Sequence, residues 1–237
     1  MRVEFRGRGV LLDIEGTTSA VAYVYDVMFP FARKALSDYL SEHWNDPVLD
    51  GVKRQFAEDA GIDAYDGWPE LRAEAVRLMD GDVKATGLKQ LQGLIWEDGF
   101  RSGELRAHVF DDVAPALAAW RDAGVDVRIY SSGSIHAQKL FFGHSEAGDL
   151  LPRFTGHYDT TTGPKREAAS YAAIAEDWGL APAEVLFLSD VTEELNAARA
   201  AGLQTALVNR PGNAEPTPAD PPHPAIDSFA ELAIGVP

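Results

Sequence analysis

A short apolar run that ends in two carboxylates constrains the fold of this chain more than any other stretch. It reads Val10-Leu11-Leu12-Asp13-Ile14-Glu15-Gly16-Thr17-Thr18. An apolar run of this kind, closed by glycine, is typical of a buried strand in a parallel sheet. Successive side chains of a strand point to opposite faces, so Asp13 and Glu15 are expected on one face where the strand ends.

That strand end is a candidate ligand site. In an open α/β sheet, ligands bind at the carboxyl ends of the strands. A buried carboxylate is unfavourable there unless a metal ion or another positive charge lies beside it. The alternative is a solvated acidic turn, since Asp and Gly are common in turns that follow strands.

The chain that follows has two parts. Residues 19–107 show helical spacing of apolar side chains and nothing strand-rich, with Pro30 expected to break or bend the first helix. Further helices of this part are expected over 52–60, 68–79 and 88–105. Beyond it, strands are expected over 125–130, 154–158, 185–188 and 205–208, and helices over 113–123, 135–142, 167–178, 193–201 and 228–234.

This alternation predicts an α/β fold with a doubly wound parallel, Rossmann-like sheet. The predicted core domain takes residues 1–18 and 108–237. Residues 19–107 would form a helical cap that is inserted directly after the first strand, where a lid over the strand ends belongs.

The charge of the chain limits its partners. A net charge of −16 and an isoelectric point near 4.7 argue against nucleic acid or an anionic membrane as a partner. An anionic substrate would need a metal ion, lysine or backbone N–H groups to offset this field. The chain has no cysteine, which excludes disulfides and thiolate metal sites. No signal peptide or membrane span is recognisable, so a cytoplasmic location is expected.

Polar groups of different kinds follow the predicted strands. Ser131 and Ser132 follow one strand, Asp190 follows another, and Lys165 precedes a helix. Together with Asp13 they suit a phosphate site with a nucleophile. Asp13 could attack phosphorus, Asp13 and Asp190 could hold Mg²⁺, and Glu15 could act as acid and base.

Each of these groups also has an ordinary explanation when it is taken alone. Residues 131–134 could form a helix cap, Lys165 could be a solvated lysine, and Asp190 could precede a helix as its N-cap. Asp111 and Asp112 are expected to cap the helix over 113–123. The order of the polar groups and their places at strand ends favour the site.

Here the sequence resembles the haloacid dehalogenase-like hydrolase superfamily. Asp13-Ile14-Glu15-Gly16-Thr17 is similar to its nucleophile motif, with Ser131 or Ser132 as its hydroxyl, Lys165 as its lysine and Ser189-Asp190 as its metal acid. Most phosphatases of the superfamily have Asp, not Glu, two residues after the nucleophile. Glu15 and four longer motifs instead resemble the enolase-phosphatases of methionine salvage. The motifs are Tyr130-Ser131-Ser132-Gly133-Ser134, Lys89-Gln90-Leu91-Gln92-Gly93, Gln138-Lys139-Leu140-Phe141-Phe142-Gly143-His144-Ser145 and Asn209-Arg210-Pro211-Gly212-Asn213.

The resemblance implies a monomeric enzyme that binds one Mg²⁺. It would enolise 2,3-diketo-5-methylthiopentyl-1-phosphate and then remove the phosphate to give the acireductone. The metal would contact Asp13, Glu15 (through its backbone carbonyl) and Asp190, and the small phosphorylated substrate would contact Ser131, Ser132 and Lys165. Asp13 would be the nucleophile and Glu15 the acid and base of the phosphatase step. The enolisation base and the residues that recognise the thioether tail stay open.

Two other functions compete with this interpretation. One is a phosphatase of the same fold that acts on another small ester, such as phosphoglycolate or a sugar phosphate. The other is a phospho-accepting signalling module of the receiver type, which the length of the chain and the helical insert disfavour. A dinucleotide-binding domain is set aside, because no G-x-G-x-x-G follows the first strand.

Overall fold

The computed structural model describes residues 3–83 and 85–235 of the chain. Its contacts divide the chain into two compact units. The first unit contains Met1–Tyr23 and Arg106–Pro237, and the second contains Val24–Leu105. Residues 19–23 and 106–107 thus group with the first unit, whereas the sequence pattern assigned them to the insert. That the second unit works as a cap stays a prediction.

The first unit is built on a six-stranded parallel sheet with the order β4-β3-β2-β5-β6-β7. In chain order the strands are β2 (Gly9–Leu12), β3 (Asp126–Tyr130), β4 (Gly156–Tyr158), β5 (Val185–Ser189), β6 (Gln204–Val208) and β7 (Ala225–Ile226). The helices that alternate with them are α6 (Val113–Asp122), α7 (Ile135–Gly143), α8 (Ala168–Trp178) and α9 (Thr192–Ala200). The predicted α/β fold with a doubly wound parallel sheet is confirmed.

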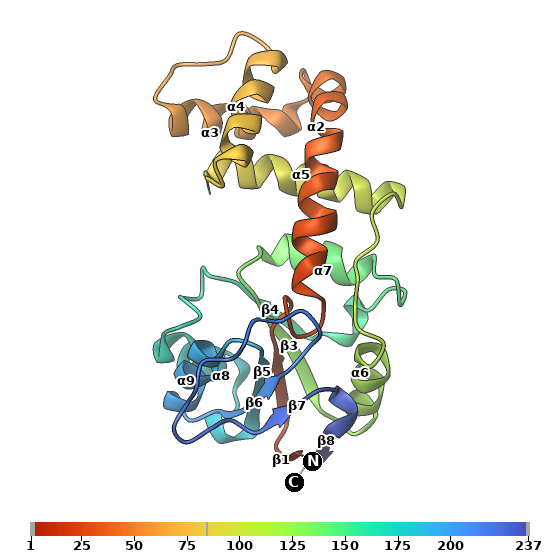
Figure 1. Cartoon of the computed structure of the whole chain (residues 1–237), viewed down its shortest axis with the longest axis vertical. Coiled ribbons are helices and arrows are strands. Elements are labelled where there is room, and N and C mark those ends of the chain that lie inside the picture. The colour runs from red at the N-terminus through yellow and green to blue at the C-terminus, as the bar shows by residue number, and fades with distance from the viewer. Residues whose placement is uncertain (1–2, 84, 236–237) are drawn as a thin grey trace. The chain divides into compact units, whose positions relative to one another are not determined.

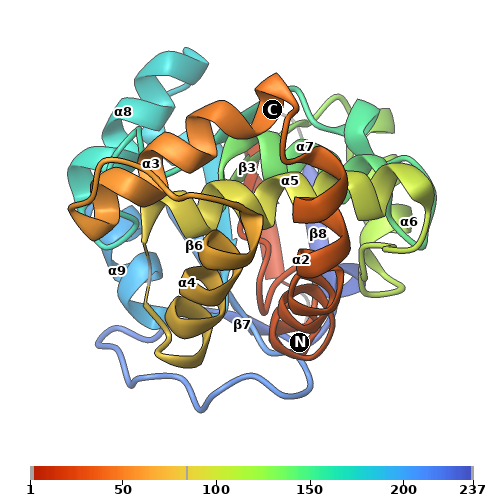
Figure 2. The same ribbon diagram turned by 90° about the horizontal axis from the view of Figure 1, so that it is seen from above.

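Helices cover both faces of this sheet. In Figure 1, α8 and α9 lie on one side of the strands and α6 lies on the other, and Figure 2 shows the same division from above. The core on the α8 and α9 side is a cluster of buried apolar side chains that includes Leu11, Tyr130, Tyr171 and Phe187. Since both faces are covered, β2 and β5 are fully buried. Strands that are buried on both faces need apolar side chains throughout, which explains the apolar sequences of these two.

The strand register aligns the ends that carry the polar groups. Leu12 of β2 is paired with Ile129 of β3 on one side and with Leu188 of β5 on the other. Asp13 therefore lies beside the end of both neighbours, close to where Ser131 and Asp190 follow. The chain runs outward from β2 to β3 and in the opposite direction from β5 to β6, so β2 and β5 flank a topological switch point.

The last part of the chain differs from the expected helix over 228–234. It forms a short 3-10 turn, η5 (Phe229–Glu231), and then a strand, β8 (Leu232–Gly235). This strand pairs in parallel with β1 (Val3–Arg6), which the sequence analysis did not identify. The predicted final helix was wrong because pairing with the distant N-terminal segment outweighs the local helix preference of so short a stretch.

Asp112 also differs from its expected role. It occupies the N-cap position of α6, but its side chain makes no capping bond to that helix. Its Oδ2 instead accepts hydrogen bonds from the Ser228 hydroxyl (2.8 Å) and the Phe229 N–H (2.6 Å), and it pairs with Arg210 (3.0 Å). The capping prediction for Asp112 was therefore wrong, because the C-terminal segment supplies competing donors.

Three short elements complete the first unit. They are α1 (Val21–Tyr23) and the 3-10 turns η3 (Leu151–Arg153) and η4 (Pro182–Glu184).

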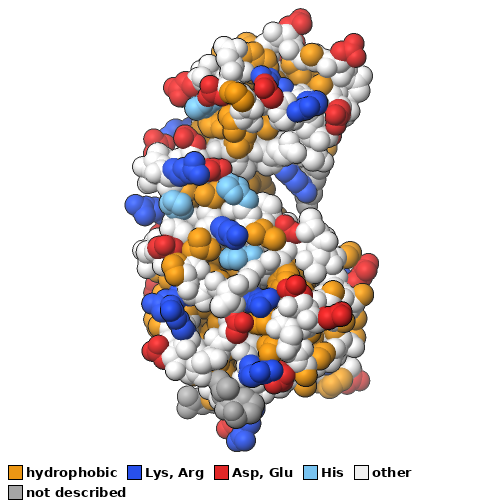
Figure 3. Space-filling model, turned by 180° about the vertical axis from the view of Figure 1, so that it is seen from behind, with side chains coloured by type: hydrophobic (Ala, Val, Ile, Leu, Met, Phe, Trp, Pro, Cys, Tyr) orange, Lys and Arg blue, Asp and Glu red, His pale blue; other side chains and the backbone are white. Residues whose placement is uncertain are grey.

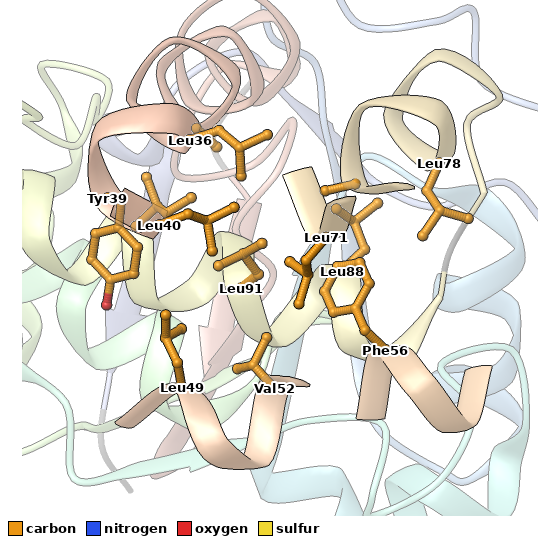
Figure 4. Packing of buried hydrophobic residues seen from close by; sticks show 13 residues of the cluster. Leu36, Tyr39, Leu40, Leu49, Val52, Phe56, Leu71, Leu78, Leu88 and Leu91 are labelled. Atoms are coloured by element: carbon orange, nitrogen blue, oxygen red, sulfur yellow. The ribbon is translucent and has the colours of Figure 1, made fainter. Parts of the chain in front are cut away.

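The second unit is helical among its described residues. It contains η1 (Val24–Met28, a π-helical turn), α2 (Phe29–His43), η2 (Pro47–Leu49, a 3-10 turn), α3 (Asp50–Ala60), α4 (Trp68–Asp80) and α5 (Thr86–Ser102). Pro30 lies in the first turn of α2, directly after η1, where the helical path changes from π to α and a proline has no N–H to donate. Leucine and aromatic side chains from α2 to α5 point toward one another and form a buried core, as Figure 4 shows.

The surface carries both signs of charge. The face in Figure 3 has Lys and Arg side chains interspersed among Asp and Glu, with apolar side chains between them. Among the described residues, no helix combines the length and the apolar character that a membrane crossing requires.

Candidate active site

A cavity of about 160 Å³ opens at the carboxyl ends of β2, β3 and β5, within the first unit. It is lined by all six residues that the sequence analysis proposed for the site: Asp13, Glu15, Ser131, Ser132, Lys165 and Asp190. Val21, Val191 and Glu194 also line it. The structure thus brings together residues that lie up to 181 positions apart in the sequence.

Asp13 is the most buried acid of the site, with 4% of its surface exposed. Its Oδ1 accepts the N–H of Ile14 at 2.8 Å and lies 2.8 Å from the Lys165 ammonium nitrogen. Its Oδ2 accepts only a long contact from the Ser189 hydroxyl, at 3.4 Å, among the described residues. One oxygen is therefore anchored, while the other is available to a ligand in the cavity.

The loop after Asp13 is folded tightly on itself. The carbonyl of Ile14 accepts the N–H groups of Thr17, Thr18 and Ser19, and the Gly16 N–H donates to the Ser19 carbonyl. Gly16 has a φ of +72°, a conformation that favours glycine. A Cβ atom on Gly16 would lie 2.2 Å from Asp190 Oδ2, so glycine lets the two acidic strand ends approach each other.

Lys165 joins two carboxylates. Its Nζ lies 2.8 Å from Asp13 and 2.7 Å from Glu194, and the side chain is 10% exposed. Burial alone would lower the pKa of Lys165, but the charges of Asp13 and Glu194 outweigh burial and raise it. Lys165 is therefore a fixed cation that partly neutralises the cavity.

The loop that carries Lys165 is held by three hydroxyl groups that donate to its carbonyls. Tyr130 donates to the carbonyl of Gly163 (2.8 Å), Ser170 to that of Pro164 (2.8 Å) and Tyr171 to that of Lys165 itself (2.7 Å). These bonds fix the backbone from which the Lys165 side chain enters the site.

The serine loop is fixed in a different way. Ser131 is 3% exposed and its Oγ accepts the Gly133 N–H at 3.3 Å, which leaves the hydroxyl proton to donate to a ligand. Ser132 is exposed, and Ser134 caps α7 by accepting the Ala137 N–H. The 131–134 segment therefore serves both as a helix cap and as part of the cavity wall.

Gln138 of α7 clamps this loop from within the fold. Its side-chain NH₂ donates to the carbonyls of Gly133 and Tyr158, both at 2.8 Å. Its Oε1 faces Nδ1 of His157 at 3.2 Å. The serine loop is thereby tied to the end of β4.

Glu194 is a site residue that the sequence analysis missed. It lies in the first turn of α9 and is 8% exposed. Acids are common in the first turn of a helix, so this position gave no sign of a role in the site. The one sequence signal that could have pointed to it is its place four residues after Asp190, which follows β5 directly.

Burial and charge raise two pKa values in the site. Burial, and then the negative charge of Asp13, raise the pKa of Asp190 to about 7. The same two causes raise the pKa of Glu194 to about 7. Asp13, Glu15, Asp190 and Glu194 thus place four carboxylates against the single ammonium group of Lys165 in the cavity wall.

This donor set fits a small divalent cation. Asp13 and Asp190 supply carboxylate oxygens on adjacent strand ends, and both side chains line the cavity. Among residues 3–83 and 85–235, no three His, Asp or Glu side chains form a metal cluster by themselves. Mg²⁺ commonly uses only one or two carboxylates and completes its shell with water and phosphate oxygens, so this arrangement suits it.

Comparisons with known proteins found relatives along nearly the whole chain. The family model of the haloacid dehalogenase-like hydrolases matches residues 8–202. The enolase-phosphatase E1 of Synechococcus elongatus is 50% identical over 231 residues, covering 94% of this chain and 96% of that protein. The enolase-phosphatase E1 of Pseudomonas aeruginosa is 48% identical over 232 residues, covering 96% and 98%. The crystal structure of the UTR4 protein of Saccharomyces cerevisiae has a TM-score of 0.80 and 35% identity, covering 94% of this chain and 98% of that one.

Proposed function

The chain belongs to the haloacid dehalogenase-like hydrolase family, and we propose that it is a magnesium-dependent enolase-phosphatase of methionine salvage. It enolises 2,3-diketo-5-methylthiopentyl-1-phosphate and then removes the phosphate to give the acireductone. The observation that carries the proposal is the buried carboxylate of Asp13, 2.8 Å from Lys165, in a cavity that Ser131, Ser132 and Asp190 also line.

In the phosphatase step, Asp13 attacks phosphorus and the bond from phosphorus to the substrate oxygen breaks. Ser131, Ser132 and the backbone N–H groups that follow them hold the phosphate oxygens. Lys165 offsets the charge on Asp13 and on the phosphate. Glu15 protonates the leaving oxygen and then activates the water molecule that hydrolyses the aspartyl phosphate.

In the enolase step, a base removes a proton from the carbon that bears the phosphate. Glu15 is the candidate for this base, since its side chain lines the cavity and reaches one methylene further than Asp would. Lys165 is unsuited to the role, because its two carboxylate partners hold its proton.

Asp13, Asp190 and the backbone carbonyl of Glu15 would hold Mg²⁺. When bound, the ion supplies positive charge that offsets the repulsion between the carboxylates and the phosphate. The same proposal includes a cap function for residues 19–107, from their place directly after the first strand, and a cytoplasmic location. It also includes a monomeric state, by resemblance to the family.

Substitution of the nucleophile tests the proposal. We expect Asp13→Asn to lower phosphate release by at least about 10³-fold while the circular dichroism spectrum stays that of the parent. An anaerobic assay that follows the ultraviolet-absorbing enol shows whether enolisation survives in this variant. Phosphate release near the parent rate would exclude the covalent mechanism.

Substrate comparison separates this function from its competitors. The parent protein should release phosphate from the diketo phosphate at least about tenfold faster than from phosphoglycolate or a sugar phosphate, a modest difference in transition-state binding. Equal rates would favour a phosphatase for another ester. A long-lived phosphoprotein without steady phosphate release would favour a receiver-type module.

A further inference from the structure

The 209–213 loop after β6 contacts the first acidic loop from outside the cavity. Arg210 Nε donates to the carbonyl of Thr17 at 3.0 Å, and the Asn213 side-chain nitrogen donates to the carbonyl of Gly16 at 2.9 Å. Neither Arg210 nor Asn213 is among the residues that line the cavity. Two successive backbone carbonyls directly after Glu15 are thus held by two side chains that belong to another part of the fold.

Arg210 is firmly anchored. It is 8% exposed, its Nη1 lies 3.0 Å from Asp112 Oδ2, and the same nitrogen donates to the carbonyl of Asp227 at 3.2 Å. Its guanidinium carbon lies 4.4 Å from the ring centre of Phe110 and 4.8 Å from that of Phe229. A buried arginine with several acceptors and aromatic rings around it has little freedom to move.

Asn213 is held in one orientation. Its side-chain nitrogen faces two carbonyl oxygens, Gly16 at 2.9 Å and Val208 at 3.4 Å. Carbonyls only accept hydrogen bonds, so the NH₂ group must face them. The amide therefore ties the Gly16 backbone to the end of β6.

The position of Gly16 matters for the acids in front of it. Its α-carbon packs against the carboxylate of Asp190, since a Cβ there would meet all three carboxylate atoms within 2.8 Å. The backbone at Gly16 therefore sets how closely Asp190 approaches the loop that carries Asp13 and Glu15. A clamp on the carbonyls of Gly16 and Thr17 fixes this approach from behind.

We infer that Arg210 and Asn213 are positioning residues that set the spacing of the three proposed Mg²⁺ ligands: the carboxylates of Asp13 and Asp190 and the backbone carbonyl of Glu15. The inference rests on the proposed function for the presence of Mg²⁺. Arg210 and Asn213 do not line the cavity, so their role is to hold the loop and not to contact substrate. Residues that orient metal ligands without touching the metal commonly change its affinity 10- to 100-fold when they are replaced.

Titration of the metal-free full-length protein with MgCl₂ in a calorimeter tests the inference, with no substrate present. We expect Asn213→Ala to raise the Kd for Mg²⁺ about tenfold. Asn209→Ala is the matched control, because Asn209 lies in the same loop and its side chain donates to Asp227, not to the acidic loop. Its Kd should stay within about twofold of the parent value.

A second variant and a rescue separate positioning from loss of structure. Arg210→Lys keeps a positive charge beside Asp112 but lacks the forked donor group, and it should raise the Kd at least as much as Asn213→Ala. In steady-state assays, raising the Mg²⁺ concentration about tenfold should restore the phosphate release of Asn213→Ala, as expected for a weakened metal site. Circular dichroism spectra that match the parent at both Mg²⁺ concentrations would show that the metal restores the site and not the fold.

The outcomes distinguish the inference from the function on which it rests. A folded Asn213→Ala protein that binds Mg²⁺ like the parent overturns the inference and leaves the proposed function standing. A parent protein that does not bind Mg²⁺ overturns both. If Asp190→Asn binds Mg²⁺ with the Kd of the parent, the proposed ligand set is wrong, and this result also overturns both.

Discussion

Gly16 is the residue where the two acidic strand ends come closest. Its φ of +72° and its contact with Asp190 are two separate demands on one position. The first demand is conformational and is shared with many turns and helix ends. The second is steric and comes from the contact with Asp190. A glycine with a similar φ and no such contact can therefore separate the two demands by experiment.

We expect Gly16→Ala to reduce phosphate release by at least about tenfold, because displacement of a catalytic-site group by an ångström commonly costs up to about 100-fold. The added Cβ would overlap the Asp190 carboxylate. The left-handed backbone should also lower the free energy of unfolding by about 1 kcal/mol. Steady-state phosphate release and urea unfolding measure the two effects.

Gly179→Ala is the matched control. Gly179 ends α8 with a φ of +69°, and a Cβ on it would meet nothing within 4 Å. It should lose only the stability that the left-handed backbone costs, about 1 kcal/mol, and keep the parent activity. Equal losses of activity in both variants would mean that backbone strain, not the contact with Asp190, limits the site.

At the scale of elements, the junction of β4 and α7 determines the position of the serine loop. His157 of β4 and Gln138 of α7 meet at 3.2 Å, and Gln138 holds the Gly133 carbonyl. Burial, and then the positive charge of Lys139, lower the pKa of His157 from 6.5 to about 4. The junction therefore contains a histidine that is neutral over a wide pH range.

This lowered pKa makes stability depend on pH. Below pH 6.5 the unfolded chain takes up a proton at His157, while the folded protein does so only near pH 4. The stability present above pH 6.5 is therefore lost as the pH falls toward 4. The loss should be on the order of 1 kcal/mol, since the ring is partly exposed to solvent.

Urea unfolding of the parent and of His157→Phe at pH 7.5, 6 and 4.5 measures this loss. Phenylalanine keeps a ring against Phe154, which packs edge-on with His157 at 6.0 Å. The parent should lose more stability than the variant between pH 7.5 and 4.5. Parallel curves for the two proteins would exclude His157 as the source.

At the scale of the molecule, the two units have separate cores. The second unit buries Leu91 among side chains of its own helices, and the first unit buries Leu11 in its sheet. Each of these leucines is fully buried. Each unit can therefore be destabilised by a substitution that does not touch the core of the other.

We expect Leu91→Ala to lower the stability of the second unit by about 2–5 kcal/mol, the usual range for a buried leucine. Mg²⁺ binding by the folded protein should stay at the parent value, since the acids lie in the first unit. Scanning calorimetry and MgCl₂ titration measure both. Leu11→Ala is the comparison, because Leu11 lies in the strand that precedes Asp13 and its loss should weaken Mg²⁺ binding as well.

If folded Leu91→Ala loses Mg²⁺ binding, the core of the second unit is not independent of the acids in the first unit.

Much of the fold could be predicted from local patterns. The strands β2 and β5 are apolar runs closed by polar residues, β3 and β6 were expected as well, and most helices begin and end within two residues of the expected bounds. The pair β1 and β8 was missed because each strand is short and depends on a partner more than 220 residues away. Local propensity carries no information about such a partner.

The sequence by itself determined which chemical groups stand at the strand ends. Asp13 and Asp190 each follow a strand directly, so they lie at its carboxyl end whatever the order of the strands in the sheet. Only the tertiary structure decided which of two adjacent glutamates joins them. Glu193 accepts the Thr217 hydroxyl at 3.0 Å in an exposed contact, while Glu194 is buried against Lys165. The two differ by about 100° around one helix, and the packing of α9 on the sheet sets which one faces the cavity. The clamp from Arg210 and Asn213 likewise exists only once β6 lies beside β5.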